Sequence, residues 1–236
     1  MTKLCTMCNQ EINKDNTFTK DGWKETEITG LCEVCFDHST FSLEENLEHV
    51  FKDCSDVKLL VDMEGVMIGG GALRRLVTPS DEIMDYDLFF TKASAVENVK
   101  SILLGHTNQC LTHEWKMVFE CPRGELYTFK NNSGDKIQLI TKRYYTSIAE
   151  LIASFDITAC CCAYDGKYIV SNRRFVSDVT NKRIYLNTVE YPAATIKRIA
   201  KYVQKGYMLP STTALEYVMM VGDMKLTEEN MALYVD

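Results

Sequence analysis

Two carboxylates separated by one residue form the part of the chain best suited to chemistry. Asp85 and Asp87 lie within an apolar stretch, and side chains two positions apart on an extended strand project from the same face. Carboxylates that close repel each other unless a cation lies between them. Mg²⁺ is commonly held by one or two carboxylates together with substrate phosphates. The pair therefore predicts a site for a divalent ion.

A glycine triplet precedes the two aspartates. Gly69, Gly70 and Gly71 follow the apolar run that begins at Val66, and glycine allows a backbone to approach a ligand closely. A helix starting there would offer free N–H groups to a polyphosphate. The combination predicts metal-assisted phosphoryl or nucleotidyl transfer. The alternative is a glycine turn followed by an edge strand that carries two solvated acids.

The same stretch resembles the signature of the polymerase-β-like nucleotidyltransferase superfamily. That signature is an apolar residue, Gly-Gly, a spacer and then Asp-x-Asp between apolar residues, and it is matched here by Gly70, Gly71, Asp85 and Asp87. The resemblance implies Mg²⁺ or Mn²⁺ as catalytic ion and an NTP as substrate. It also implies transfer to a hydroxyl on a nucleic-acid end or a protein, and the short chain favours transfer without a template.

Many members of that superfamily carry a third acid on a later strand. The corresponding position here is Gln138, whose neutral amide cannot act as a base. Residues 137–166 resemble predicted nucleotidyltransferase-like proteins of large viruses, phages and some fungi, and this resemblance implies that Asp156 completes the catalytic site. From the residues alone, Asp156 could equally cap a turn or pair with Arg143.

Two sets of basic side chains are candidates for nucleotide binding. Arg74 and Arg75 follow the glycines closely and could hold a triphosphate. The second set recurs at helical spacing and could contact an NTP tail or a nucleic-acid backbone: it comprises Arg198, Lys201 and Lys205. For both sets the alternative is an ordinary solvated basic face.

Four of the ten cysteines form two Cys-x-x-Cys pairs, Cys5 with Cys8 and Cys32 with Cys35. Two such pairs can supply four thiolates to Zn²⁺, and a site closed by four thiolates holds a structural ion. The intervening segment contains turn and β-branched residues, which predict the β-hairpin of a zinc ribbon. Disulfides are the weaker alternative in a reducing cytosol.

Length and composition are those of a globular protein with one full domain and a small module. The 236 residues are expected to form a zinc-ribbon module over 1–41 and a nucleotidyltransferase-like domain over 42–236, helical from 191 to 236. The net charge of −7 argues against a general nucleic-acid coat. No apolar run is long enough for a membrane helix, and the N-terminus lacks the apolar core of a secretory signal. The expected location is the cytoplasm, that of the host if the protein is encoded by a virus.

The order of patterns predicts an α/β (α+β) fold with a mixed sheet and flanking helices. The expected helices start at Ser42, with Glu45 completing a capping box, and continue over 91–105, 147–154, 195–207 and within 211–236. The expected strands cover 66–68, 82–90, 115–120, 125–130, 136–141, 156–164 and 167–170. The short apolar run 57–61 fits a helix or a strand.

A second class of function stays open, a catalytically inactive adaptor that keeps this fold and binds nucleic acid or protein through its zinc module. Gln138 and the acidic net charge favour it, whereas the intact aspartate pair favours the enzyme. A sequence-specific DNA-binding zinc protein is the third and weakest alternative.

Overall fold

The structure, a computed structural model, describes residues 3–6, 8–35, 43, 46–107, 109, 111–228 and 230–231. The chain forms two compact units. We call Leu43–Ile152 with Cys162–Val170 the sheet unit, and Met1–Ser42, Ala153–Cys161 and Ser171–Asp236 the helical unit. The domain boundary expected at residues 41 and 42 stays a prediction, and the predicted capping box of Ser42 and Glu45 lies outside the described residues.

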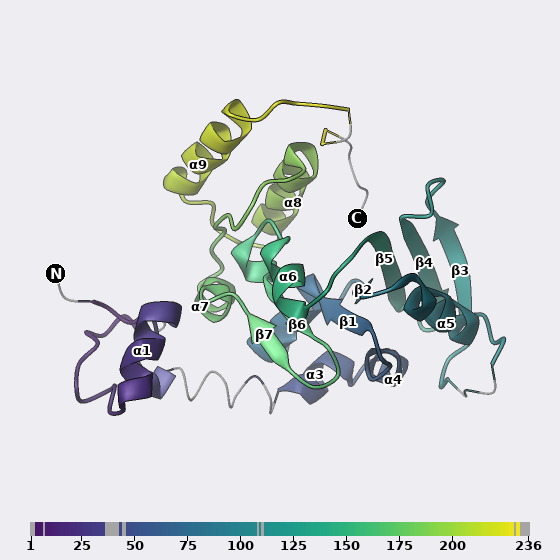
Figure 1. The fold of residues 1–236 in the computed structure, drawn as a ribbon, viewed down its shortest axis with the longest axis horizontal. Helices are drawn as coiled ribbons and strands as arrows, with labels where there is room; N and C mark the ends of the chain where they lie inside the picture. Colours follow the sequence, from purple (N-terminus) through teal and green to yellow (C-terminus); the bar gives the residue numbers. More distant parts are fainter. Residues whose placement is uncertain are drawn as a thin grey trace. The chain divides into compact units, whose positions relative to one another are not determined.

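The predicted α/β class is confirmed by a mixed sheet of seven strands in the order β3-β4-β5-β2-β1-β6-β7 (Figure 1). Strands β2 and β5 pair in parallel, whereas β1–β2, β1–β6, β3–β4 and β4–β5 are antiparallel. The strands are β1 (Val66–Gly69), β2 (Tyr86–Phe90), β3 (Trp115–Glu120), β4 (Leu126–Asn131), β5 (Lys136–Tyr144), β6 (Cys162–Tyr164) and β7 (Ile169–Ser171).

Five short helices belong to the sheet unit as described, of which α4, α5 and η1 contact the sheet while α3 packs on η1 and α4. They are α3 (Leu47–Phe51), α4 (Ser55–Val61), α5 (Ala93–Leu103), α6 (Ile148–Ala153) and the 3-10 helix η1 (Gly70–Leu76). Helix α5 contacts β2 and β5 and buries Ala95, Val99 and Ile102, the helical spacing expected for its core face. The segment left open at 57–61 is helical and belongs to α4, which contacts β1.

Alternation along β2 separates the core from the candidate site. Tyr86, Leu88 and Phe90 are buried on one face of the strand, so Asp87 projects from the opposite face. Strand β5 repeats the pattern, because Ile137 and Leu139 are buried on either side of Gln138 in the sequence. The hydrophobic positions therefore hold both strands in register and aim the polar positions away from that core.

Two of the predicted strands are shorter than expected. The run 82–90 becomes β2 only from Tyr86, because Arg75 Nε donates to the Asp81 carbonyl at 2.6 Å and draws the preceding segment back toward η1. The run 156–164 is wrong as one strand. Its first part forms the 3-10 helix η2 (Thr158–Cys160), closed by a hydrogen bond of 3.1 Å from the Cys161 N–H to the Thr158 carbonyl, and only β6 is extended.

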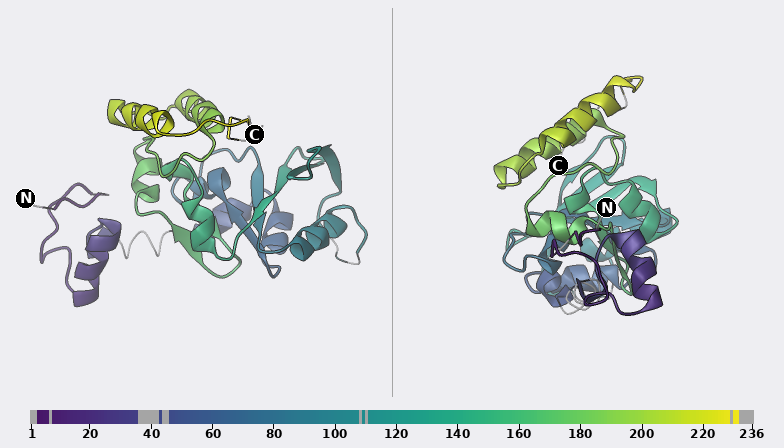
Figure 2. Two further views of the ribbon diagram at one scale, coloured as in Figure 1. Left: turned by 45° about the horizontal axis from the view of Figure 1, so that its top comes forward. Right: turned by 90° about the vertical axis from the view of Figure 1, so that its left-hand side faces the viewer.

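The helical unit contains α1 (Lys20–Thr29), η2, α7 (Phe175–Thr180), α8 (Pro192–Gln204) and α9 (Ser211–Gly222). Helix α8 confirms the helix predicted over 195–207, and α9 confirms only the first part of the predicted helical tail, because residues 223–228 are not helical. Helix α7 was not predicted. Helix α9 lies beside α8 (Figure 2), where the Tyr217 hydroxyl donates to the Pro192 carbonyl at 2.9 Å. None of the described helices is both long and apolar enough to cross a membrane.

The predicted hairpin between the two cysteine pairs is wrong, because this segment forms helix α1. Thr19 caps the helix start by accepting from the Gly22 N–H at 2.8 Å. Gly30 ends the helix in the left-handed region, at φ 73°, and its N–H donates to the Thr26 carbonyl. A capping threonine and a terminal glycine are strong local helix signals, and here they outweigh the β-branched residues between them.

Candidate functional site

Three neighbouring strands place one polar row across the sheet. Gly69 of β1 lies opposite Asp87 of β2, and Asp87 lies opposite Gln138 of β5. Directly opposed residues project from the same face. The strand pairing thus puts a carboxylate between the glycine-rich end of β1 and an amide.

Gly70 lies next to this row and has no side chain to fill the space beside Asp87. Its φ is 78°, in the left-handed region that residues with a side chain rarely adopt. A Cβ at Gly70 would lie 3.6 Å from Asp87 Oδ2, in van der Waals contact with it. Gly70 is itself buried, so the missing side chain leaves a space the size of a methyl group beside this carboxylate oxygen. The predicted approach of phosphates to the glycine triplet stays a prediction.

Asp85 lies immediately before β2 and is partly buried. In the described part of the chain, neither Asp85 nor Asp87 belongs to a group of three or more converging His, Cys, Asp or Glu ligands. Mg²⁺ keeps few protein ligands and completes its octahedron with water and phosphate oxygens. The donor set therefore fits an ion that arrives with a nucleotide rather than one held by the protein alone.

Arg74 and Arg75 are buried within the sheet unit. Arg74 Nε lies 3.2 Å from Asp81 Oδ2. Arg75 forms an ion pair with Asp53 and also donates to the His49 carbonyl at 3.1 Å. These contacts hold the segment before β2 against η1 and α3, and the predicted role of the two arginines in nucleotide binding stays a prediction.

Asp156, in the helical unit, is buried and bound to α8. Its Oδ2 accepts from Arg198 Nη1 at 2.5 Å and from the Thr195 hydroxyl at 3.0 Å. The alternative pairing with Arg143 is wrong, because the partners of the Asp156 carboxylate are Arg198 and Thr195. Arg198 therefore serves at least to anchor α8.

Lys201 and Lys205 follow Arg198 along α8 at intervals of three and four residues, so the three basic residues lie along one side of the helix. Their contact with a nucleotide or nucleic acid stays a prediction.

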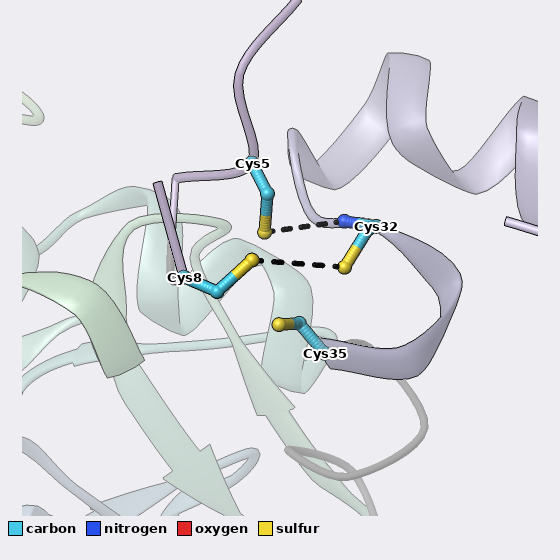
Figure 3. Close-up of side chains that lie close together, drawn as sticks. All are labelled: Cys5, Cys8, Cys32 and Cys35. Carbon is cyan, nitrogen blue, oxygen red and sulfur yellow. Dashed lines mark hydrogen bonds between the residues drawn. The ribbon is translucent and has the colours of Figure 1, made fainter. Parts of the chain in front are cut away.

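The four predicted zinc ligands converge in the helical unit (Figure 3). Their sulfur atoms all lie within 4.8 Å of one another, and Cys8 Sγ is 4.0 Å from Cys32 Sγ. A tetrahedral ion with Zn–S bonds of about 2.3 Å would place its sulfurs about 3.8 Å apart. The Cys32 N–H donates to Cys5 Sγ at 3.3 Å, which favours a thiolate at Cys5. Donor type and spacing therefore fit zinc.

Burial opposes charge on these thiols when no cation is bound. It raises the pKa of Cys32 and of Cys35, and the neighbouring cysteines add to the effect at Cys35. A cation with four thiolates around it reverses this preference.

A second group of potential ligands, Cys54, Asp56 and His113, has no signal in the sequence, because His113 lies far along the chain from the other two. The carboxylate of Asp56 is buried and already accepts several hydrogen bonds, from Thr112 at 2.7 Å and Trp115 Nε1 at 2.9 Å among others. Burial by itself raises the pKa of Asp56, but these bonds outweigh it and lower the pKa. The group fastens the segment before β3 to α4, which is a structural role.

The fold resembles that of CCA-adding enzymes. The structure of the Thermotoga maritima CCA-adding enzyme complexed with tRNA_CCA matches with a TM-score of 0.54 and 17% identity, over 78% of this chain and 45% of that chain. CCA-adding enzyme complexes with CTP and with ATP each match with a TM-score of 0.55, at 17% and 15% identity, over 78% of this chain and 46% of those chains. At such identities the likeness establishes the fold alone, and the chain spans less than half the length of these enzymes.

No curated protein matches the chain significantly. The family model described as "Gabija anti-defense 2 family protein" matches residues 41–182, more than half of the 236 residues.

Proposed function

This chain belongs to the Gabija anti-defense 2 family, and from that premise we propose that it is a metal-dependent nucleotidyltransferase. It moves a nucleoside monophosphate from an NTP to a hydroxyl acceptor, a nucleic-acid end or a protein, without a template. The transfer serves the anti-defense role for which the family is named. The nucleotidyltransferase-like fold, similar to that of CCA-adding enzymes, supports the reaction class.

The proposal depends most on one observation, the proximity of Asp87 to the Gly70 bend. A carboxylate oxygen lies within van der Waals reach of a position that only glycine leaves empty. A charged oxygen beside a glycine bend suits a phosphate accompanied by a divalent ion.

In this proposal Asp85 and Asp87 hold Mg²⁺ or Mn²⁺, and Gly69, Gly70 and Gly71 let the phosphates approach the backbone. The acceptor oxygen forms a bond to the α-phosphorus of the NTP as the bond to pyrophosphate breaks, and the hydroxyl proton passes to solvent water. The bound ion would supply stabilisation of the charge that develops on the phosphate oxygens. Gln138 can hydrogen-bond to substrate but cannot take up the acceptor's proton. Asp156 is assigned to the catalytic site on the resemblance alone. Arg198, Lys201 and Lys205 are assigned to nucleotide binding on their helical spacing.

The four cysteines are proposed to hold a structural zinc ion. Four thiolates leave the ion no open coordination position, so it has no part in catalysis. The element around the ion would instead recognise the acceptor.

The decisive experiment incubates the protein with labelled NTPs and Mg²⁺ or Mn²⁺, and compares wild type with Asp87→Ala. We expect label transfer or pyrophosphate release in wild type and its loss in the variant. Glu97→Ala is the matched control, because Glu97 is an exposed acid on α5 that pairs only with the neighbouring Lys100 among the contacts of the described residues. Equal signals from wild type and Asp87→Ala would exclude the enzyme.

The inactive adaptor remains a second candidate because Gln138 lies directly opposite Asp87 in the register. If the protein is an adaptor, no NTP is consumed with either ion, and Asp87→Ala leaves partner binding unchanged. Loss of the four-cysteine site would instead abolish binding.

A further inference from the structure

Helix α9 exposes most of its large apolar side chains. Leu215, Val218 and Met219 are exposed to 60%, 63% and 60%, and they lie three and four residues apart, on one side of the helix. The helix contacts its own unit through the other side, where Thr213 is buried and Tyr217 reaches α8. The outward side of α9 is therefore its apolar side, the reverse of an ordinary surface helix.

A helix of this length is marginal in water without packing. It spans 12 residues, and isolated helices shorter than about 12–15 residues are seldom stable. Contiguous exposed apolar surface usually marks an interaction site. The outward side of α9 is thus a candidate interaction surface, and burying it would add to the packing that the helix already has on α8.

Helix α8 of the same unit carries a surface that is complementary to α9. Ile196 and Val203 are exposed to 46% and 47% and lie seven residues apart, so they form an apolar stripe on one side of the helix. Lys197, also exposed, borders this stripe. On α9, the exposed acids Glu216 and Asp223 border the apolar residues in the same way.

The charges decide between kinds of partner. From 211 to 224 the chain contains two acids and no lysine or arginine, so α9 itself offers no positive charge to attract an anionic membrane or a nucleic acid. A partner needs an apolar helical stripe bordered by positive charge, and α8 provides that surface.

We propose that α9 of one molecule packs on α8 of a second copy of this chain, and that the protein is a symmetric dimer. In an isologous interface each contact occurs twice, so both α9 helices are covered and both α8 stripes are buried. Lys197 of each copy lies near Glu216 of its partner. The dimer is independent of the catalytic proposal, because none of its residues is assigned to the transfer reaction.

Sedimentation velocity of the full chain tests the dimer over about 1 to 100 µM, a range that brackets micromolar affinity. We expect a dimer in wild type. Val218→Lys on α9 and Val203→Lys on α8 should each weaken association at least about tenfold, because each buries an unpaired charge. The matched control is Val118→Lys on β3, where the valine is exposed to a similar 57%, and it should leave association unchanged.

A charge exchange separates direct contact from loss of folding. Glu216→Lys and Lys197→Glu should each weaken the dimer, and the chain carrying both changes should regain it. Circular dichroism of each variant verifies that the helices persist. A monomer at every concentration, equal weakening by Val118→Lys, or failure of the double exchange to restore association would overturn the proposal.

Discussion

Asp87 and Gln138 face each other directly across the parallel pair of β2 and β5. Gln138 thus occupies the position next to Asp87 that the superfamily resemblance assigns to a third acid. The carboxylate has a neutral neighbour, which lowers the negative charge of the site and with it the affinity for a divalent ion.

Replacing Gln138 by glutamate should therefore strengthen binding of Mn²⁺ by about tenfold, since a second carboxylate beside Asp87 favours the cation. Without the ion, the like charges should lower the melting temperature, and Mn²⁺ should restore it. Thermal unfolding with increasing Mn²⁺ measures both effects. Gln138→Met controls for loss of the amide. If Gln138→Glu and wild type respond equally to Mn²⁺, the two side chains do not share an ion site.

Gly70→Ala should reduce nucleotide binding, because the new methyl group fills the space beside Asp87 Oδ2. The change also introduces strain at φ 78°, at a cost of about 1–2 kcal/mol. Gly105→Ala provides the matched control, since Gly105 has φ 70° with nothing within 4 Å of an added Cβ. Urea unfolding should show similar losses of stability in both variants. Calorimetric titration with an NTP and Mg²⁺ should show weaker binding only for Gly70→Ala, and equal binding in both would remove Gly70 from the site.

Zinc removal should unfold the element around α1, because the four thiols then lose the ion that holds them together. The expected content is one zinc ion per chain by mass spectrometry of metals. Cys32→Ser should abolish it, whereas Cys121→Ser, at a free cysteine outside the group, should retain it. Binding should weaken as pH falls, since protons compete for thiolates. Zinc retained in full by Cys32→Ser would contradict the assignment.

Asp56→Asn should destabilise the sheet unit by about 1–3 kcal/mol, because the amide cannot accept all the hydrogen bonds that the carboxylate accepts. The folded-state pKa of Asp56 is lowered, so its contribution is complete above the unfolded pKa of about 3.9 and is lost as pH falls through the folded value. The stability difference between wild type and variant should therefore shrink toward pH 3. Urea unfolding at pH 7 and at pH 3 measures it, with exposed Asp15→Asn as the control. If the stability difference between wild type and Asp56→Asn did not change with pH, the loss of stability would come from altered packing and not from the lost negative charge.

Short-range patterns predicted much of the fold. The apolar spacing of 91–105 predicted α5, and strand-like runs separated by turn residues predicted β3, β4 and β5 to within a few residues. The cluster of four cysteines was also predicted, because two cysteines three positions apart can supply half of a tetrahedral ligand set. The β-branched residues between the two pairs predict a hairpin, but the caps at Thr19 and Gly30 favour the helix that the structure shows.

By itself the sequence determined the candidate chemistry of this protein: an Asp-x-Asp pair after glycines, and four thiols in two pairs. Only the tertiary structure decided which residues face them. It placed Gln138 opposite Asp87, bound Asp156 to Arg198 and buried Arg75 against Asp53. The physical reason is that strand register and side-chain pairing join segments that are far apart in the chain. The packing of the whole core selects this register and pairing, and no local preference does.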